Sequence, residues 1–204
     1  MTKYLDTDDI NQLEQRKRTA FINSLSGFKS LNLIATINSK NITNVAVFNS
    51  VFHLGADPAL IGFIMRPDSV ERHTLSNITE SEQYTINHIN SAIFEKAHQT
   101  SARYGSEISE FDAVGLTPEF KNNFKAPFVK ESVIQIGVNL VEIVPIKINS
   151  TSMVIGKIVN VYFPEECWLE DGTLDIEKSG TISGSSLNGY HSTQLIKRLQ
   201  YSKP

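Results

Sequence analysis

SVIQIGVNLVEIVPIKINSTSMVIGKIVNVYF, residues 132–163, contains two long β-rich segments. Its two halves, 132–148 and 152–163, are rich in Val and Ile, which are residues that favour strands. The triplet Asn149-Ser150-Thr151 between them has the polar character of a hairpin turn. The stretch therefore predicts two long antiparallel strands joined by a tight turn.

Three shorter strand-like runs precede this hairpin. The first starts at Leu31 and ends at the polar residues 38–41, the second covers 43–53, and the third covers 59–65. Their short connections predict an antiparallel meander, because parallel strands need a crossover of about a dozen residues or more. No G-x-G-x-x-G motif follows the first run, so a Rossmann cofactor site has no support.

The other segments predict short helices and loops around the sheet. Residues 8–25, 69–78 and 92–100 have helical character, and residues 84–89 resemble another strand. Residues 104–128 are polar and rich in turn residues, so we expect a long surface excursion there. Six or more strands with peripheral helices predict a mainly β, antiparallel barrel.

Length and composition fit one globular domain. The chain has 204 residues, of which 40% are hydrophobic and 20% charged, so it can bury a core of ordinary size. We expect a single domain over 1–204, with its core at about 20–165 and a C-terminal arm at about 166–204.

Charge and cysteine content narrow the class of protein. The formal net charge of -3 disfavours nucleic acid as the main partner, because duplex binders carry a basic face. The N-terminus soon turns acidic, and no apolar run reaches the roughly 20 residues that a membrane helix needs. Cys167 is the only cysteine, so no internal disulfide can form. We expect a cytoplasmic protein without nucleic-acid or membrane partners.

Metal and nucleophile motifs are absent from the sequence. The five histidines show no H-E-x-x-H or H-x-x-E-H spacing, and Cys167 has no C-x-x-C partner. No G-x-S-x-G elbow marks a nucleophilic serine. The sequence therefore predicts neither a metal site nor a catalytic nucleophile.

The segment RPDSVERHTLSN, residues 66–77, predicts a place for an anion. Pro67 ends the preceding strand, and Asp68 or Ser69 can cap a new helix. A helix start flanked by cations and hydroxyls suits a phosphate. An ordinary capped helix with solvated charges is the alternative, and Asp68 and Glu71 count against a phosphate if they point inward.

The segment NVAVFNSVF, residues 44–52, places polar side chains inside an apolar strand. Asn44, Asn49 and Ser50 need hydrogen-bond partners if they are buried. A flat heterocycle edged with carbonyl and N–H groups would supply them. A strand end or bulge that faces water explains the same residues equally well.

The order of these segments resembles the flavin reductase-like family, which has the FMN-binding split β-barrel fold. The likeness extends over roughly residues 20–195, and each motif gains weight from its place in the series. The matching stretches are NVAVFNS at 44–50, Arg66, RHTLSNI at 72–78, YTIN at 84–87, SEFDAVGLT at 109–117 and LNGY at 187–190.

The resemblance implies a homodimeric FMN protein that transfers hydride from NAD(P)H to flavin, with FMN at the dimer interface. It implies a ring site formed by Asn44, Ala46, Val47, Phe48, Asn49 and Ser50. It implies a phosphate site formed by Arg66, Ser69, Arg72, His73 and Thr74. No catalytic side chain is expected, because the cofactor carries the chemistry.

Two departures from the family pattern concern these sites. Val47 stands in place of the usual proline and is expected to alter the strand beside the ring. His73 stands in place of the usual aspartate and adds a possible positive charge near the phosphate.

Other functions remain open on the same fold. The chain could be a non-catalytic FMN carrier or sensor, or another flavin-dependent oxidoreductase with its own small substrate. A reductase could pass its reduced flavin to a separate acceptor protein. The choice between NADH and NADPH does not follow from the sequence.

Overall fold

The computed structural model describes residues 1–67, 73–200 and 202–203 of the chain. Its α-helices are α1 (Thr7–Gln12), α2 (Gln15–Ser24), α3 (His73–Ser81), α4 (Phe94–Gln99) and α5 (Glu110–Val114). Its main strands are β2 (Asn32–Ile37), β3 (Thr43–Phe48), β4 (Phe52–Ala56), β5 (Ala59–Met65), β6 (Gln83–His88), β9 (Gln135–Ile146) and β10 (Thr151–Tyr162). Smaller elements are β1 (Lys29–Ser30), β7 (Pro118–Glu119), β8 (Phe128–Val129), a 3-10 turn (Glu165–Cys167), β11 (Ser183–Ser185) and β12 (Gly189–His191).

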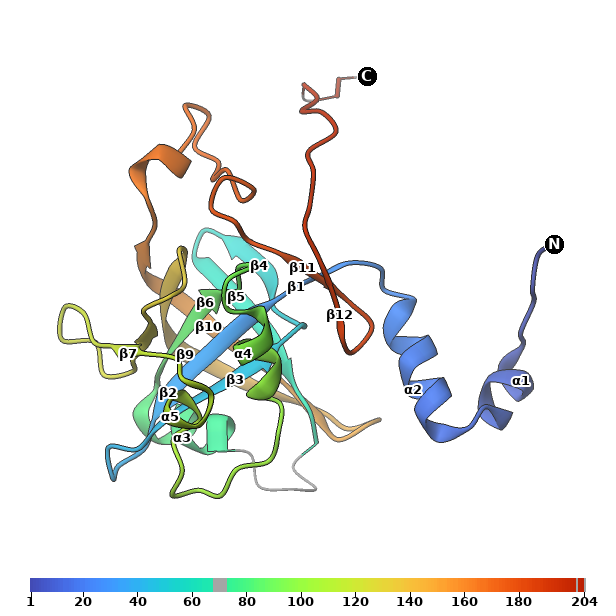
Figure 1. Cartoon of the computed structure of the whole chain (residues 1–204), viewed down its shortest axis with the longest axis horizontal. Coiled ribbons are helices and arrows are strands. Elements are labelled where there is room, and N and C mark those ends of the chain that lie inside the picture. Colours follow the sequence, from blue (N-terminus) through green and yellow to red (C-terminus); the bar gives the residue numbers. More distant parts are fainter. Residues whose placement is uncertain (68–72, 201, 204) are drawn as a thin grey trace.

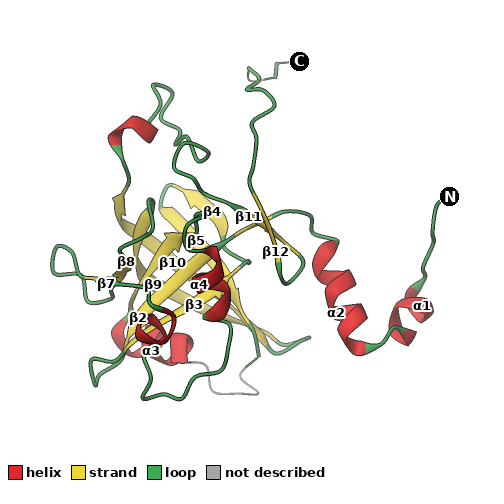
Figure 2. Ribbon diagram, viewed as in Figure 1, coloured by secondary structure: helices red, strands yellow, loops and turns green. Residues whose placement is uncertain are grey.

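A seven-stranded antiparallel sheet forms the body of the molecule (Figures 1 and 2). Its strands lie in the order β3-β2-β6-β9-β10-β5-β4, and each neighbouring pair is antiparallel. The long hairpin predicted from residues 132–163 is confirmed as β9 and β10. Register shifts between Ile155 and Gly156 and between Ile158 and Asn160 bend this pair, since bulges increase strand twist.

The two edges of the sheet meet because β3 runs almost directly into β4. Only residues 49–51 separate the two strands, although they stand at opposite ends of the strand order. The Ser50 hydroxyl accepts a hydrogen bond from the Ile64 N–H at 3.3 Å and donates to the Ile64 carbonyl at 3.1 Å. Phe48 packs edge-on against Phe63 of β5, with ring centroids 5.1 Å apart. The predicted single strand over 43–53 is therefore wrong, because the chain turns this corner to curl the sheet into a barrel.

Two apolar cores lie on opposite faces of the sheet. Ile34 points into the barrel, where it joins Phe63 and Tyr84. Leu33 and Ala35, on either side of Ile34 in the sequence, face the outer helices. Both faces of β2 are thus buried, which fits its nearly continuous apolar sequence. Burying these side chains supplies the main driving force for folding.

The N-terminal helical region differs from its prediction. One helix was expected over 8–25, but the chain breaks at Leu13, whose backbone is extended. The Glu14 carboxylate then caps α2 by accepting from the backbone N–H groups of Arg16 and Lys17. Neither helix has a buried residue, and both project away from the barrel (Figure 1).

The segment 104–128 also differs from its prediction as a surface excursion. It contains α5, which buries Glu110 and Phe111 against the body of the protein. Phe124 and Ala126 are buried as well. Part of this segment is therefore packed against the body of the protein, although Ile108 and Phe120 within it are exposed. None of the helices within the described residues is long and apolar enough to span a bilayer.

Candidate functional site

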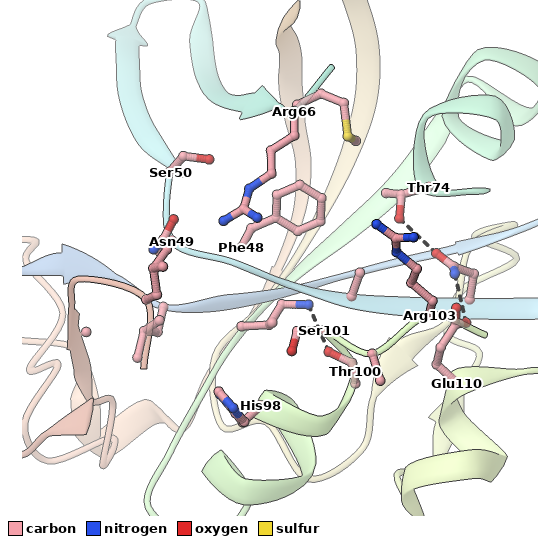
Figure 3. Close-up of a pocket in the computed structure, with 18 of the residues that line it drawn as sticks. Phe48, Asn49, Ser50, Arg66, Thr74, His98, Thr100, Ser101, Arg103 and Glu110 are labelled. Carbon is pink, nitrogen blue, oxygen red and sulfur yellow. Dashed lines mark hydrogen bonds between the residues drawn. The ribbon is translucent and has the colours of Figure 1, made fainter. Parts of the chain in front are cut away.

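A pocket of about 420 Å³ opens beside the β3–β4 corner (Figure 3). Its walls come from β3, the end of β5, the start of α3, the segment after α4, and the hairpin of β11 and β12. The volume falls in the range of roughly 300–1,000 Å³ that is typical of small-molecule sites. It is therefore the place to compare with the residues predicted from sequence.

Every predicted site residue that the structure describes lines this pocket. The set consists of Asn44, Ala46, Val47, Phe48, Asn49, Ser50, Arg66, His73 and Thr74. Ser69 and Arg72 lie outside the described residues. The curled sheet thus brings the strand and the helix start, which are separate in sequence, to one cavity.

The β3 strand presents its free edge to the pocket side. It pairs with β2 only, so alternate backbone groups have no strand partner. The Val47 N–H donates instead to the Thr100 hydroxyl at 2.9 Å. That hydroxyl donates to the Ala97 carbonyl at 2.7 Å, which ties the end of α4 to β3. Val47 therefore stands at a fixed position in the pocket wall despite the absence of the family proline.

A buried polar network supports one end of the pocket. Asn44 donates to the Glu110 carboxylate at 2.7 Å and accepts from the Thr74 hydroxyl at 2.9 Å. Behind it, the Thr36 hydroxyl lies 3.4 Å from the same Asn44 oxygen and accepts from Asn77 at 3.0 Å. The protein itself thus satisfies the Asn44 side chain, so its burial does not require a ligand.

Glu110 is the ionisable member of this network. Burial raises the pKa of its carboxyl, while hydrogen bonds from its own backbone, from Asn44 and from Val45 oppose that rise. The nearby His73 charge opposes it more weakly. Because the Glu110 carboxylate accepts hydrogen bonds from these groups, it fixes the Asn44 side chain and the adjoining edge of β3.

Two arginines enter the pocket from different walls (Figure 3). Arg66 follows β5, and its side chain reaches towards Asn49 and Ser50. Arg103 follows α4, and its side chain points towards Thr74. Arg103 is therefore a cation beside Thr74 that the sequence analysis did not name, and the assignment of Arg66 to the phosphate stays a prediction.

Two further segments of the pocket were not expected from sequence. The segment after α4 contributes residues from Thr100 to Ser106, and the β11–β12 hairpin contributes residues between Gly184 and Tyr190. The Tyr190 hydroxyl lies 2.8 Å from His98 Nδ1 and joins the hairpin to α4. The resemblance at LNGY included part of the hairpin, and the hydroxyl groups and the cation of the run Thr100-Ser101-Ala102-Arg103 are the signal that could have pointed to the other segment.

Comparison with known proteins agrees with this arrangement. The model of the flavin reductase like domain matches residues 26–174. The chain belongs to this family. A candidate flavin reductase with a split barrel domain from Shewanella frigidimarina NCIMB 400 is 48% identical, with a TM-score of 0.95 over 98% of this chain and 100% of that chain.

More distant relatives of this flavin reductase-like chain share the fold. Nitrilotriacetate monooxygenase component B from Bacillus cereus is 18% identical, with a TM-score of 0.85 over 98% of this chain and 99% of that chain. An uncharacterized protein from Aquifex aeolicus (strain VF5) is 29% identical over 115 residues. That match covers 55% of this chain and 59% of the Aquifex protein, so less than two thirds of that curated relative is spanned. The predicted antiparallel split barrel is thus confirmed.

Proposed function

We propose that the protein binds FMN in this pocket and transfers hydride from NAD(P)H to flavin, as a homodimeric cytoplasmic reductase. The proposal rests on two features that meet in one cavity: an end with cations and hydroxyl groups, and the free edge of strand β3. A phosphate group suits the former, and a flat ring edged with donors and acceptors suits the latter. Membership of the flavin reductase-like family supports flavin as the ligand.

The phosphate end is formed by Thr74, His73 and Arg103, all of which line the pocket. Arg103 can meet phosphate oxygens with two parallel hydrogen bonds. The Thr74 hydroxyl donates to Asn44 in this structure and would turn its proton to the phosphate when the ligand binds. His73 begins α3, so backbone N–H groups of the first helical turn lie at the same end. These residues fit a dianionic phosphate, and we propose Arg66 as a further contact, together with Ser69 and Arg72, which lie outside the described residues.

The ring would lie along β3 and the corner that follows it. Ala46, Val47 and Phe48 form this wall, and Asn49 and Ser50 complete it at the corner. Bound FMN would supply the hydride acceptor and donor, and the chain would supply position and a hydrogen-bonded edge. Phe48 is held by Phe63, and Ser50 by Ile64, so the wall is rigid before any ligand binds. Such preorganisation lowers the entropic cost of binding.

A homodimer is supported by apolar side chains that the single chain leaves exposed at both of its ends. Leu25 and Phe28 near the N-terminal helices are 64% and 70% exposed. In the C-terminal tail, Ile196 is fully exposed at 100% and Leu199 is 81% exposed. A two-fold partner would cover these residues. Light scattering should give twice the chain mass of 22.8 kDa, and a monomer would contradict the proposal.

The alternative is a carrier or sensor that binds FMN without turnover. The test is oxidation of NADH and of NADPH, followed by absorbance, without flavin and with FMN, FAD or riboflavin. We expect nucleotide oxidation that depends on flavin. Tight FMN binding without oxidation of either nucleotide would favour the carrier, and no FMN binding at micromolar concentration would reject both functions.

A further inference from the structure

One polar pair in the pocket wall has no part in the FMN contacts proposed above. The Tyr190 hydroxyl lies 2.8 Å from His98 Nδ1, and both residues line the pocket. In Figure 3, His98 lies on one side of the β3 edge, whereas Phe48 and Arg66 lie on the other. We propose that Tyr190, oriented by His98, binds the carbonyl oxygen of a quinone that accepts electrons from the bound flavin. This inference rests on the proposed function.

The Tyr190 ring is held on two sides. It packs against Phe94 with ring centroids 5.4 Å apart and edge-on against His98 at 5.7 Å. Tyr190, Phe94 and Val47 all pack against the apolar core that faces the outer helices. His98 is also tied to β3, because Thr100, two residues later, accepts from the Val47 N–H at 2.9 Å. The Tyr190 hydroxyl is therefore fixed relative to the strand proposed to hold the flavin ring.

The pair can present a hydrogen-bond donor to a ligand. Tyr190 is half-buried, and burial raises the pKa of its hydroxyl, which keeps the proton on the oxygen. When His98 Nδ1 carries a proton, it donates to the Tyr190 oxygen and leaves the phenolic O–H free. The complementary group on a ligand is an acceptor oxygen, such as a carbonyl.

The surface beside this hydroxyl is apolar. Gly184 of β11 pairs with Tyr190 of β12, so the two residues share one face of the hairpin. A Cβ atom on Gly184 would lie 2.8 Å from the Leu31 side chain, so Leu31 packs directly under that face. Leu31 and Leu187 both line the pocket. A flat apolar ring that carries acceptor oxygens suits this wall, and an alkylated quinone has both properties.

The proposed reaction assigns one proton to Tyr190. Reduction of a quinone to a hydroquinone takes up one hydride and one proton, and it converts two C=O groups into two O–H groups. The hydride comes from NAD(P)H by way of flavin, as in the proposed function. Tyr190 gives the proton to the carbonyl oxygen as its own O–H bond breaks. Solvent returns a proton to Tyr190 through His98, which is exposed.

The binding test titrates duroquinone, a tetramethyl quinone, into oxidised FMN-loaded protein and follows the flavin absorbance. Tyr190→Phe should weaken duroquinone about threefold to tenfold, the effect of one neutral hydrogen bond. FMN affinity in this variant should change by less than about threefold. Tyr162→Phe is the matched control, because its hydroxyl accepts from Asn122 at 2.8 Å outside the pocket lining. It should leave duroquinone affinity unchanged.

The proton transfer has its own readout. At saturating duroquinone, Tyr190→Phe should slow duroquinone reduction by about a hundredfold, since a positioned general acid contributes roughly 10²–10⁴-fold. Weaker binding with an unchanged maximal rate would overturn the role of Tyr190 as proton donor.

His98 is tested as a positioning residue. His98→Ala should weaken duroquinone by a factor similar to that of Tyr190→Phe, and His98→Asn, which keeps an N–H donor, should restore part of the affinity. The double variant Tyr190→Phe with His98→Ala should bind duroquinone as Tyr190→Phe alone does, because His98 acts through the hydroxyl. Additive losses would show that His98 does not orient Tyr190.

The remaining outcomes separate this subsite from the proposed function. Equal duroquinone affinity in Tyr190→Phe and the unaltered protein, with normal FMN binding, would overturn the subsite and leave the proposed function intact. Equal losses of duroquinone and FMN in Tyr190→Phe would show a general disturbance of the pocket and would also overturn the subsite. Failure of the unaltered protein to bind FMN would instead reject the proposed function itself.

Discussion

The two ends of the pocket are built in opposite ways. At the Thr74 end, Asn44 and Glu110 are buried and hydrogen-bonded to each other, and the network continues into the barrel. At the corner end, Arg66 is exposed and reaches towards Asn49 and Ser50. A buried, cross-linked site holds a ligand in one geometry, whereas an exposed cationic site attracts a charged ligand and releases it. The Thr74 end is therefore fixed by the protein itself, whereas the Arg66 end is open to solvent.

The largest effect is expected from breaking the buried end. Asn44→Ala leaves the Glu110 carboxylate and the Thr74 hydroxyl without this partner in a buried place. We expect a loss of about 2–4 kcal/mol in the free energy of unfolding, measured by urea denaturation. Asn11→Ala, an exposed asparagine on α1, is the matched control and should change stability by less than about 0.5 kcal/mol. Equal small losses in both variants would show that the network contributes little.

The two arginines give the next largest effect and compare the ends directly. Arg103→Ala should weaken FMN about tenfold to a hundredfold, because a charge-assisted contact to phosphate contributes roughly 1.5–3 kcal/mol. Riboflavin lacks the phosphate and should bind as before. Arg66→Ala should weaken FMN less than Arg103→Ala does, because the Arg66 side chain is exposed and points towards the corner, and it should leave riboflavin unchanged. If Arg66→Ala weakens FMN and Arg103→Ala does not, the phosphate belongs at the corner end.

A smaller effect is expected from the protonation of Glu110. Burial raises the pKa of its carboxyl in the folded protein above the ordinary value of 4.5. The folded state then binds the proton more tightly than the unfolded state. The stability that this carboxyl contributes to the folded protein is therefore lost as pH rises from about 4.5 through its folded pKa. Glu110→Gln removes that titration. Denaturation at several pH values should therefore show that the stability of Glu110→Gln, relative to the unaltered protein, improves as pH rises through this window. A constant difference would contradict the assignment.

The smallest effect concerns the hairpin that bounds the pocket. Tyr190→Phe removes the hydroxyl that lies 2.8 Å from His98 Nδ1 but keeps the ring that packs against Phe94. One partly exposed hydrogen bond contributes about 1 kcal/mol, so amide exchange in β11 and β12 should accelerate by less than about tenfold. Exchange in β9 and β10 is the internal reference. Equal acceleration in both pairs would mean that the change is global.

The local sequence pattern was enough to predict the strands. The features that it missed depend on contacts between segments that are distant in the sequence. The Val- and Ile-rich runs specified β9 and β10, because side chains of that shape favour strands wherever they pack. The break at residues 49–51 depends on closure of the barrel, which no single segment encodes. The same holds for Arg103, which reaches Thr74 only because α4 packs on β3.

For Asn44, the sequence indicated a polar side chain that needs hydrogen-bond partners but not the groups that supply them. A buried amide does need partners, as the sequence analysis assumed, but Glu110 and Thr74 from distant segments provide them. Sequence reasoning identified the position and could not identify the partner, because the distance of 66 residues between Asn44 and Glu110 carries no local signal.

The free edge of β3 has a consequence for the behaviour of the protein at high concentration. An unpaired strand edge invites pairing with a strand of another molecule and, through it, aggregation. Here the Val47 N–H donates to the Thr100 hydroxyl, and the Glu110 carboxylate accepts from the Asn44 side chain on the same strand. An incoming strand would have to displace two side chains that are themselves anchored. The residues that shape the pocket wall thereby also prevent intermolecular sheet extension along it.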